Sequence, residues 1–203
     1  MFRSFPHLNR LIFRKMSTVS PLKPYYLWLD LEMTGLDESK DQIVEVAARV
    51  TDSDFKSFGE YQSIVKCSQE ALDNMGDYVR EMHTKNGLLA MIPNGCPIAE
   101  ADAALVKLID EHFDKKNPPI LAGNSIHVDR RFLRVQMPLM HSKLHYRMLD
   151  VSSLKIVFSS KYDLYYTKKL AHRAIDDINE SIEELKYFLQ YVNVEDNKRK
   201  ESE

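Results

Sequence analysis

Two carboxylates set inside an apolar segment constrain this 203-residue chain more than any other feature of its sequence. Residues 25–33 read Tyr-Tyr-Leu-Trp-Leu-Asp-Leu-Glu-Met, and this β-prone apolar run predicts a strand that is buried on both faces. Because side chains alternate along a strand, we expect Asp30 and Glu32 to point to the same side. Ionised carboxylates are costly in such surroundings unless cations, hydrogen bonds or a metal ion compensate their charge.

Further acidic residues indicate which kind of compensation applies. On its own, the pair of Asp30 and Glu32 is also compatible with a purely structural role, in which protein groups satisfy both carboxylates. Asp129 and Asp177, with His172 five positions before the latter, each fall in a predicted helical setting later in the chain. Hard divalent cations such as Mg²⁺ and Mn²⁺ prefer carboxylate oxygens, and Mg²⁺ usually keeps positions open for water and phosphate. The whole set therefore predicts a two-metal centre that cleaves phosphodiesters.

Asp129 lies in Gly-Asn-Ser-Ile-His-Val-Asp-Arg-Arg, residues 123–131, at the predicted start of a helix that follows a short strand. One interpretation is structural, because a carboxylate in the first turn of a helix is favoured by the helix dipole and can pair with Arg130 or Arg131. The other is functional, because α/β sheets build their sites where the strands end. Both remain open at this point.

His172 and Asp177 belong to His-Arg-Ala-Ile-Asp-Asp-Ile, residues 172–178. Five positions along a helix rotate a side chain well away from the first one, so the two residues cannot share one helical face. We therefore expect His172 on the loop before the helix and Asp177 in its first turns. A neutral imidazole near two metal ions can accept a proton from an attacking water, whereas an isolated histidine would be interpreted as a surface residue.

The order of the predicted elements gives an α/β fold, a mixed β-sheet flanked by α-helices. The length of the chain suits one domain, which we expect over residues 21–193. A charged, flexible tail is expected at 194–203. No stretch approaches the length that a membrane span requires. The predicted strands are 25–33, 43–50, 59–66, 120–123 and 146–152, the last of which turns into a helix. The predicted helical segments are 68–91, 98–113, 128–136 and one from about 174.

The first fifteen residues differ from the rest, with four Arg or Lys side chains and no acidic one. On a helix the basic side chains would gather on one face and the apolar ones opposite. This pattern is typical of a mitochondrial transit peptide, so residues 1–20 are expected to be a leader and linker that direct the protein to the matrix. The alternative is an untidy N-terminal tail. A product that starts at Met16 would lack the leader, which predicts a cytosolic or nuclear form.

Removal of residues 1–15 takes the formal net charge from −2 to −6, because the segment carries four positive charges. Proteins that move along a long polyanion normally carry a basic stripe on their surface, and a net negative charge fits this pattern poorly. The charge suits an enzyme whose positive charge is local, supplied by bound metal ions and one or two arginines. A nucleic-acid substrate should therefore be short.

Four blocks of the sequence, taken in order, resemble the oligoribonuclease family of DEDDh-type 3′→5′ exonucleases, which have a ribonuclease-H-like fold. Each block alone is weak, but all four in the correct order and spacing are highly specific, and they extend over about residues 25–192. The blocks are Asp-Leu-Glu-Met-Thr-Gly-Leu at 30–36, Gly-Asn-Ser with Asp-Arg-Arg-Phe-Leu at 123–133, His-Tyr-Arg with Leu-Asp-Val-Ser at 145–152, and His-Arg-Ala-Ile-Asp-Asp-Ile with Glu-Ser at 172–181.

The resemblance implies a catalytic set and a substrate. Two Mg²⁺ or Mn²⁺ ions would be held by Asp30, Glu32, Asp129 and Asp177, and His172 would be the general base. The substrate would be RNA of two to about five nucleotides with a free 5′ phosphate, cleaved to 5′-mononucleotides as the last step of RNA decay. The active form would be a homodimer without any membrane association.

The resemblance also implies contacts with the bases. Leu36 matches the apolar wedge between two bases, and Tyr78 stands where many members have a stacking tryptophan. His83 matches a histidine that contacts the substrate. The structural alternatives are an ordinary turn for Leu36 and a core aromatic for Tyr78.

A cap on the terminal phosphate follows in the same way. Ser125, Arg147 and Ser152 match this cap, and Tyr146 matches a residue that reaches across a homodimer interface into the neighbouring site. As neighbours on a predicted strand, Tyr146 and Arg147 should point to opposite sides. The structural alternatives are helix caps for the two serines and a core aromatic for Tyr146.

Two departures and two rival functions accompany this interpretation. Residues 159–169 differ from the usual loop of the family, and a tyrosine at position 78 is expected to stack less strongly than tryptophan. The enzymatic rival is a related exonuclease that trims the 3′ ends of longer RNA or DNA. The rival from another class is a ribonuclease-H-like binding module that has kept the cleft and lost catalysis.

Overall fold

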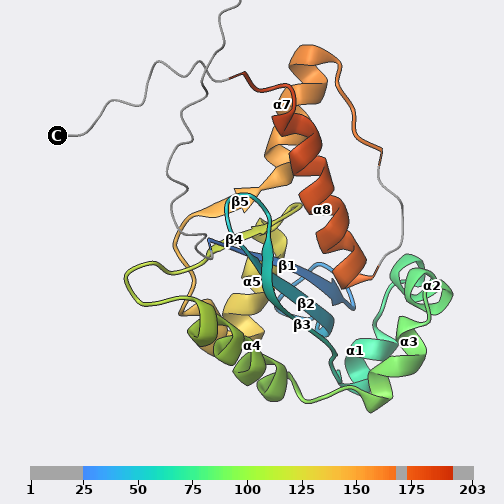
Figure 1. Cartoon of the computed structure of the whole chain (residues 1–203). Coiled ribbons are helices and arrows are strands. Elements are labelled where there is room, and N and C mark those ends of the chain that lie inside the picture. Colours follow the sequence, from blue (N-terminus) through green and yellow to red (C-terminus); the bar gives the residue numbers. More distant parts are fainter. Residues whose placement is uncertain (1–24, 168–172, 194–203) are drawn as a thin grey trace, which may run out of the picture.

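The computed structural model describes residues 25–167 and 173–193, built around one five-stranded sheet with the strand order β3-β2-β1-β4-β5 (Figure 1). β1, β2 and β3 are antiparallel neighbours, whereas β4 and β5 run parallel to β1. The predicted mixed sheet is thus confirmed. The strands are β1 (Tyr26–Met33), β2 (Ile43–Thr51), β3 (Ser57–Ile64), β4 (Ile120–Gly123) and β5 (Met148–Asp150).

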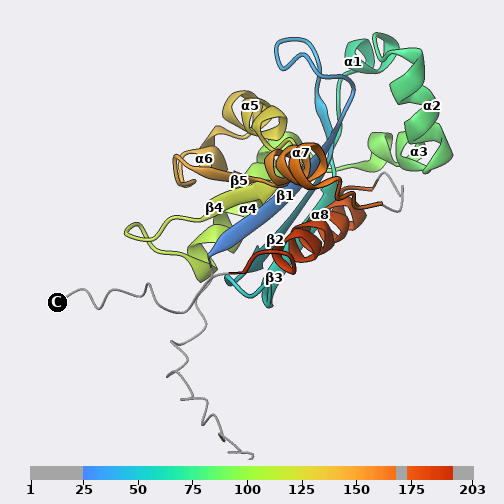
Figure 2. The same cartoon turned by 90° about the horizontal axis from the view of Figure 1, so that it is seen from above.

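Helices cover both faces of the sheet, as the view in Figure 2 shows for α5 and α6 on one side and α8 on the other. The helical segment predicted over 68–91 is divided into three short helices, and the other predicted helices lie where expected. The helical elements are α1 (Gln69–Asp73), α2 (Asp77–Lys85), α3 (Leu88–Met91), η1 (Ile92–Asn94), α4 (Ile98–His112), α5 (His127–Gln136), α6 (Pro138–His141), α7 (Val151–Tyr162) and α8 (Ala174–Leu189).

The alternation of side chains along β1 divides the core into two layers. Leu27, Leu29 and Leu31 belong to the layer that packs against α4, α5 and α6. Trp28 belongs to the other layer, with the apolar side chains of α8. Since Asp30 and Glu32 follow Trp28 at even positions, the same alternation directs them to the face that α8 covers. The apolar, two-sided burial that the sequence predicts for this strand is confirmed.

β1 is paired along its whole length with β2, but it pairs with β4 only from Tyr26 to Trp28. β4 ends at Gly123, where a Cβ atom would lie 2.8 Å from the carbonyl oxygen of Leu29. Only glycine permits this close approach, after which the chain turns into α5. Among the described residues, the C-terminal half of β1 therefore has no neighbouring strand on its β4 side, at the level of its two carboxylates.

β5 is shorter than predicted, because it begins at Met148 rather than at Tyr146. The guanidinium of Arg130 donates hydrogen bonds to the carbonyl oxygens of His145 and Tyr146, so this backbone is bound by a side chain instead of by the sheet. The expectation that Tyr146 and Arg147 point to opposite sides is wrong in this structure. The guanidinium carbon of Arg147 lies 5.1 Å from the centre of the Tyr146 ring, and the two side chains stack.

The leader, the tail at 194–203 and His172 lie outside the described residues. Among the helices that the structure does describe, none is both long and apolar enough to cross a membrane.

Candidate active site

Three carboxylates converge where β1 meets the start of α8. Asp30 and Glu32 come from β1, and Asp177 comes from the first turn of α8, as predicted. One carboxylate oxygen from each residue lies within 4.8 Å of the others. Glu32 is buried, whereas Asp30 and Asp177 are half-buried, so part of the group is accessible to solvent. The convergence arises because the apolar face of α8 packs on the layer of Trp28 and Ala47 and carries its N-terminus over the carboxylates.

Asp129 reaches the same region from the other layer. Its Oδ1 accepts a hydrogen bond of 3.0 Å from the backbone N–H of Leu31, on the side of β1 that β4 leaves unpaired. Neither adjacent arginine is its partner, because Arg130 binds backbone carbonyls and Arg131 lies 3.5 Å from Glu38. Burial raises the pKa of Asp129 to about 7, although the Leu31 hydrogen bond acts in the opposite direction. Asp129 thus stands beside the cluster of three rather than within it.

The electrostatics of the cluster are clearest at Glu32. Burial is the main reason that the pKa of Glu32 rises to about 8. The carboxylates of Asp177, Glu45 and Asp129 act in the same direction, whereas the guanidinium of Arg173 opposes them. An all-oxygen set of three converging carboxylates in a partly buried place fits a hard divalent cation. The donor chemistry is therefore suited to the metal ions that the sequence implies.

His172 lies outside the described residues. The helix that follows it begins at Ala174, with Arg173 as the N-cap residue. The prediction that the helix starts after His172 is therefore confirmed.

Two hydroxyls of the predicted phosphate cap are brought together. Ser125 Oγ and Ser152 Oγ are 3.3 Å apart, and the N–H of Ser125 donates to Ser152 Oγ and to Asp150 Oδ1 at 2.9 Å each. Ser125 has a φ of 48°, in the left-handed region that residues other than glycine seldom occupy. Asn124 Oδ1 accepts a hydrogen bond from Ser152 Oγ. Asn124 and Asp150 support this pair and were not singled out from the sequence, because their contacts join segments that are distant in the chain.

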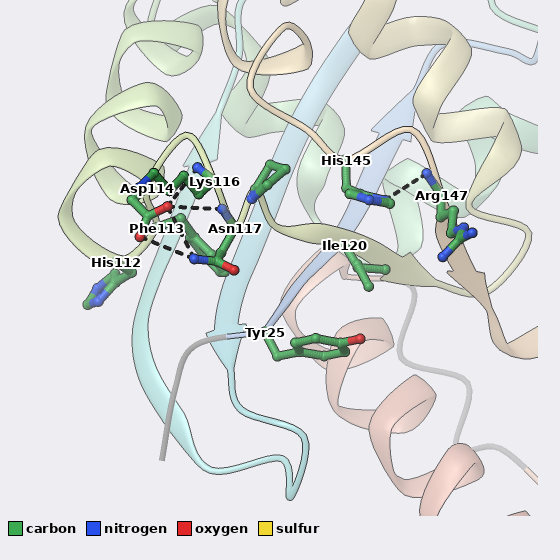
Figure 3. Close-up of a pocket in the computed structure, with 10 residues that line it drawn as sticks. Tyr25, His112, Phe113, Asp114, Lys116, Asn117, Ile120, His145 and Arg147 are labelled. Carbon is green, nitrogen blue, oxygen red and sulfur yellow. Dashed lines mark hydrogen bonds between the residues drawn. The ribbon is translucent and has the colours of Figure 1, made fainter. Parts of the chain in front are cut away.

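Arg147, the third predicted member of the cap, lies elsewhere. It lines a cavity of about 490 Å³ with Tyr25, Ile120 and His145, shown in Figure 3. Ile120 begins β4, whereas Ser125 follows the end of that strand, so the cavity and the serine pair are near opposite ends of β4. The backbone N–H of Arg147 donates to His145 Nδ1 at 3.0 Å, which holds the segment in a bend.

The predicted base contacts fall into two groups. Leu36, Tyr78 and Tyr146 are 69%, 77% and 70% exposed, so the interpretation of either tyrosine as a core residue is wrong. His83, by contrast, is fully buried. One ring nitrogen of His83, Nε2, is 3.0 Å from the carbonyl oxygen of Met33, and the other, Nδ1, is 3.9 Å from Glu32 Oε2. His83 therefore borders the acidic cluster from within the protein.

Glu45 and Arg173 are prominent in the site and were missed in the sequence. Glu45 is fully buried on β2, directly across from Glu32 in the antiparallel register. Arg173 forms an ion pair with it at 2.9 Å. The signal available was the one used for Asp30, an acidic residue inside an apolar strand, since residues 43–50 read Ile-Val-Glu-Val-Ala-Ala-Arg-Val.

Comparison with known proteins agrees with this fold and site. Residues 27–185 match the family model described as Exonuclease (RNase_T). Escherichia coli Exonuclease I in complex with a dT13 oligonucleotide superposes with a TM-score of 0.60 at 16% identity, over 80% of this chain and 40% of that chain. The same enzyme with a 5cy-dT13 oligonucleotide gives 0.63 at 15% identity, over 83% and 41%. The chain spans about two fifths of these Exonuclease I chains, and the likeness shows the shared ribonuclease-H-like fold. The fold and the acidic site thus define a nuclease of the exonuclease class.

Curated relatives narrow this class. The oligoribonuclease of Corynebacterium diphtheriae is 45% identical over 179 residues, which cover 85% of each chain. That of Streptomyces coelicolor is 43% identical over 173 residues, 83% of this chain and 86% of the relative. That of Tropheryma whipplei is 42% identical over 178 residues, 85% and 96%. The chain belongs to the oligoribonuclease family.

Proposed function

We propose that this protein is a metal-dependent 3′→5′ exoribonuclease that hydrolyses oligoribonucleotides of two to about five residues to 5′-mononucleotides. The observation that carries the proposal is the convergence of Asp30, Glu32 and Asp177 within 4.8 Å, in a member of the oligoribonuclease family. Its place in metabolism is the completion of RNA degradation.

The residues that would hold two Mg²⁺ or Mn²⁺ ions are Asp30, Glu32, Asp129 and Asp177. When bound, the ions supply positive charge for the scissile phosphate and lower the pKa of the attacking water. Asp129 is held in place by the Leu31 N–H, which leaves its second oxygen uncommitted by that bond. His172 takes the proton of the attacking water on an imidazole nitrogen.

The substrate is bound at both ends in this proposal. Leu36 inserts between the two bases, and the exposed ring of Tyr78 stacks on one of them. Ser125 and Ser152 bind the 5′ phosphate with their adjacent hydroxyls. In this structure Arg147 lines the cavity beside Tyr25 and Ile120, away from the two serines. The proposal therefore requires the bend before β5 to rearrange, so that Arg147 can complete the cap. A closed cap limits substrate length, since a longer chain has a nucleotide where the cap stands.

A homodimer is part of the same proposal. Tyr146 is 70% exposed and precedes β5 in a bend, so its ring is available to a second subunit. Contact of Tyr146 with the partner's site would separate it from Arg147 and free the guanidinium for the phosphate.

The proposed mitochondrial location rests on the sequence of residues 1–15 alone, because the relatives named above are bacterial. A product starting at Met16 would remain in the cytosol or nucleus. Fusion of residues 1–20 to a fluorescent protein tests the leader, and diffuse fluorescence would contradict it.

The rival function, trimming of longer RNA or DNA, is favoured by the fold shared with Exonuclease I and opposed by the net charge of −6 without the leader. The deciding experiment compares mononucleotide release from a 5′-phosphorylated diribonucleotide and from RNA and DNA of about twenty nucleotides, with Mg²⁺ or with EDTA. Rapid release from the diribonucleotide alone supports the proposal. Equal or faster release from the long substrates supports the rival, and no release from any of them supports a binding module.

A further inference from the structure

Glu45 is a buried carboxylate that the mechanism above does not use. It is fully buried on β2 and lies across from Glu32 in the register between β1 and β2. Because it is at an odd position of β2, like Ala47, it faces the layer that α8 covers. A carboxylate in this place needs strong partners to remain ionised.

Its partners come from two elements. The guanidinium of Arg173 donates to both carboxylate oxygens, from Nε to Oε2 at 3.1 Å and from Nη2 to Oε1 at 2.9 Å. The amide of Gln62, on β3, donates to Oε1 at 2.8 Å. A forked contact of this kind fixes the orientation of the guanidinium plane as well as its distance.

Arg173 occupies the position from which α8 begins. It is the N-cap residue, and its carbonyl oxygen accepts the backbone N–H groups of Asp176 and Asp177. The backbone N–H of Ala174, the first residue of α8, donates to Glu45 Oε2 at 3.5 Å. A negative charge at the N-terminus of a helix is also favoured by the helix dipole. The contact between Glu45 and Arg173 therefore fixes the first turn of the helix that carries Asp177.

Stability alone does not account for a charged pair at this place. Buried ion pairs add little net stability compared with well-packed apolar side chains of similar size. The forked pair instead gives Arg173 a defined position. Arg173 is one residue after His172 and four residues before Asp177 in the chain.

We propose that Glu45 and Arg173 are positioning residues, whose forked ion pair sets where α8 begins and thereby holds Asp177 against Asp30 and Glu32. The inference rests on the proposed function for its role in hydrolysis. In this proposal both residues act through the position of Asp177 and not by contact with the substrate. Loosening the pair leaves the metal ligands in the chain but lets the start of α8 shift away from β1.

The test uses the full chain and four variants. Arg173→Lys keeps the charge and loses the fork, Glu45→Gln keeps the shape and loses the charge, and the double variant Glu45→Gln/Arg173→Gln removes both charges of the pair. The matched control is Arg49→Gln, because Arg49 also joins β2 to α8, through Asn179, but away from the start of the helix. Each protein is measured for thermal unfolding, for Mn²⁺ affinity without substrate, and for kcat and KM on a 5′-phosphorylated diribonucleotide.

We expect the double variant to unfold near the wild-type temperature, with Mn²⁺ affinity and kcat each lowered by about tenfold to a hundredfold, the range for residues that orient metal ligands. KM should change little, and Arg173→Lys should fall between. Arg49→Gln should resemble wild type. If the double variant does not fold, the folded single variants decide by the same criterion.

Wild-type Mn²⁺ affinity and kcat in the folded pair variants would overturn the inference, as would equal losses in Arg49→Gln. The Mn²⁺ titration needs no hydrolysis, so the two proposals can fail separately. If the wild-type chain releases no mononucleotides but the pair variants still bind Mn²⁺ more weakly, the proposed function fails and the positioning inference stands.

Discussion

Replacement of Glu32 by glutamine should stabilise the protein when no metal ion is present. Glu32 is 8% exposed, and burial next to three other carboxylates raises its pKa from 4.5 to about 8. Glutamine has nearly the same shape and carries no charge. The substitution should therefore remove an electrostatic penalty without leaving a cavity.

The sign and size of the effect follow from linkage between protonation and folding. A carboxyl whose pKa is higher in the folded state binds its proton more tightly there, so the folded protein loses stability as the pH rises from 4.5 towards 8. At about 1.36 kcal/mol per pH unit, the loss reaches about 3 kcal/mol at pH 7. For a chain of this length, that corresponds to an unfolding temperature about 6–12 °C higher in Glu32→Gln. Below pH 4.5 the two proteins should be equally stable.

The assay is thermal and urea unfolding of both proteins in EDTA between pH 4.5 and 8.5, with exposed Glu111→Gln as the control. With Mn²⁺ added, wild type should gain more stability than the variant, because ligand binding stabilises only a folded state with an intact site. Equal stability of wild type and Glu32→Gln in EDTA at pH 8, or the same gain from Mn²⁺ in both, would refute the assignment of Glu32 to the charged cluster.

Three further experiments test the catalytic and substrate-binding groups. His172→Ala should slow turnover strongly, spare Mn²⁺ binding and abolish the rise of rate through the imidazole pH range; an unchanged profile would exclude the general-base role. Arg147→Ala should weaken binding of a 5′-phosphorylated diribonucleotide by about 1.5–3 kcal/mol, and an equal loss without the phosphate would show that it reads another group. A Tyr146→Ala chain mixed with an Asp30→Ala chain should regain activity as heterodimers, and no recovery in proven heterodimers would leave Tyr146 outside the neighbouring site.

The central features of the site can be predicted because they depend on local periodicity. Alternation along β1 is enough to place Asp30 and Glu32 on one side of the sheet. Rotation along a helix is enough to separate His172 from Asp177 and to start the helix between them. Burial on both faces of β1 follows from its apolar composition.

Features that depend on distant contacts could not be predicted in this way. The buried carboxylate of Glu45 has its ion-pair partner, Arg173, 128 residues later in the chain. Asp129 had two open interpretations, and the choice depends on β4 being too short to pair with Leu31. The strand predicted from Tyr146 starts later, and the carbonyl oxygen of Tyr146 is bound by the guanidinium of Arg130 from α5. In each case the deciding partner belongs to another segment of the chain.

The central claim is that the carboxylates of β1 and α8 form a metal-dependent site for very short RNA. It is tested most directly by hydrolysis of a 5′-phosphorylated diribonucleotide by wild type, Asp177→Ala and Asp176→Ala, each with Mg²⁺ and with EDTA. Asp176 is the neighbouring carboxylate in the same first turn, and its side chain is exposed.

We predict release of 5′-mononucleotides by wild type and Asp176→Ala with Mg²⁺, and none by Asp177→Ala or by any of the proteins in EDTA. Hydrolysis by folded Asp177→Ala near the wild-type rate, or undiminished hydrolysis by wild type in EDTA, would contradict the account.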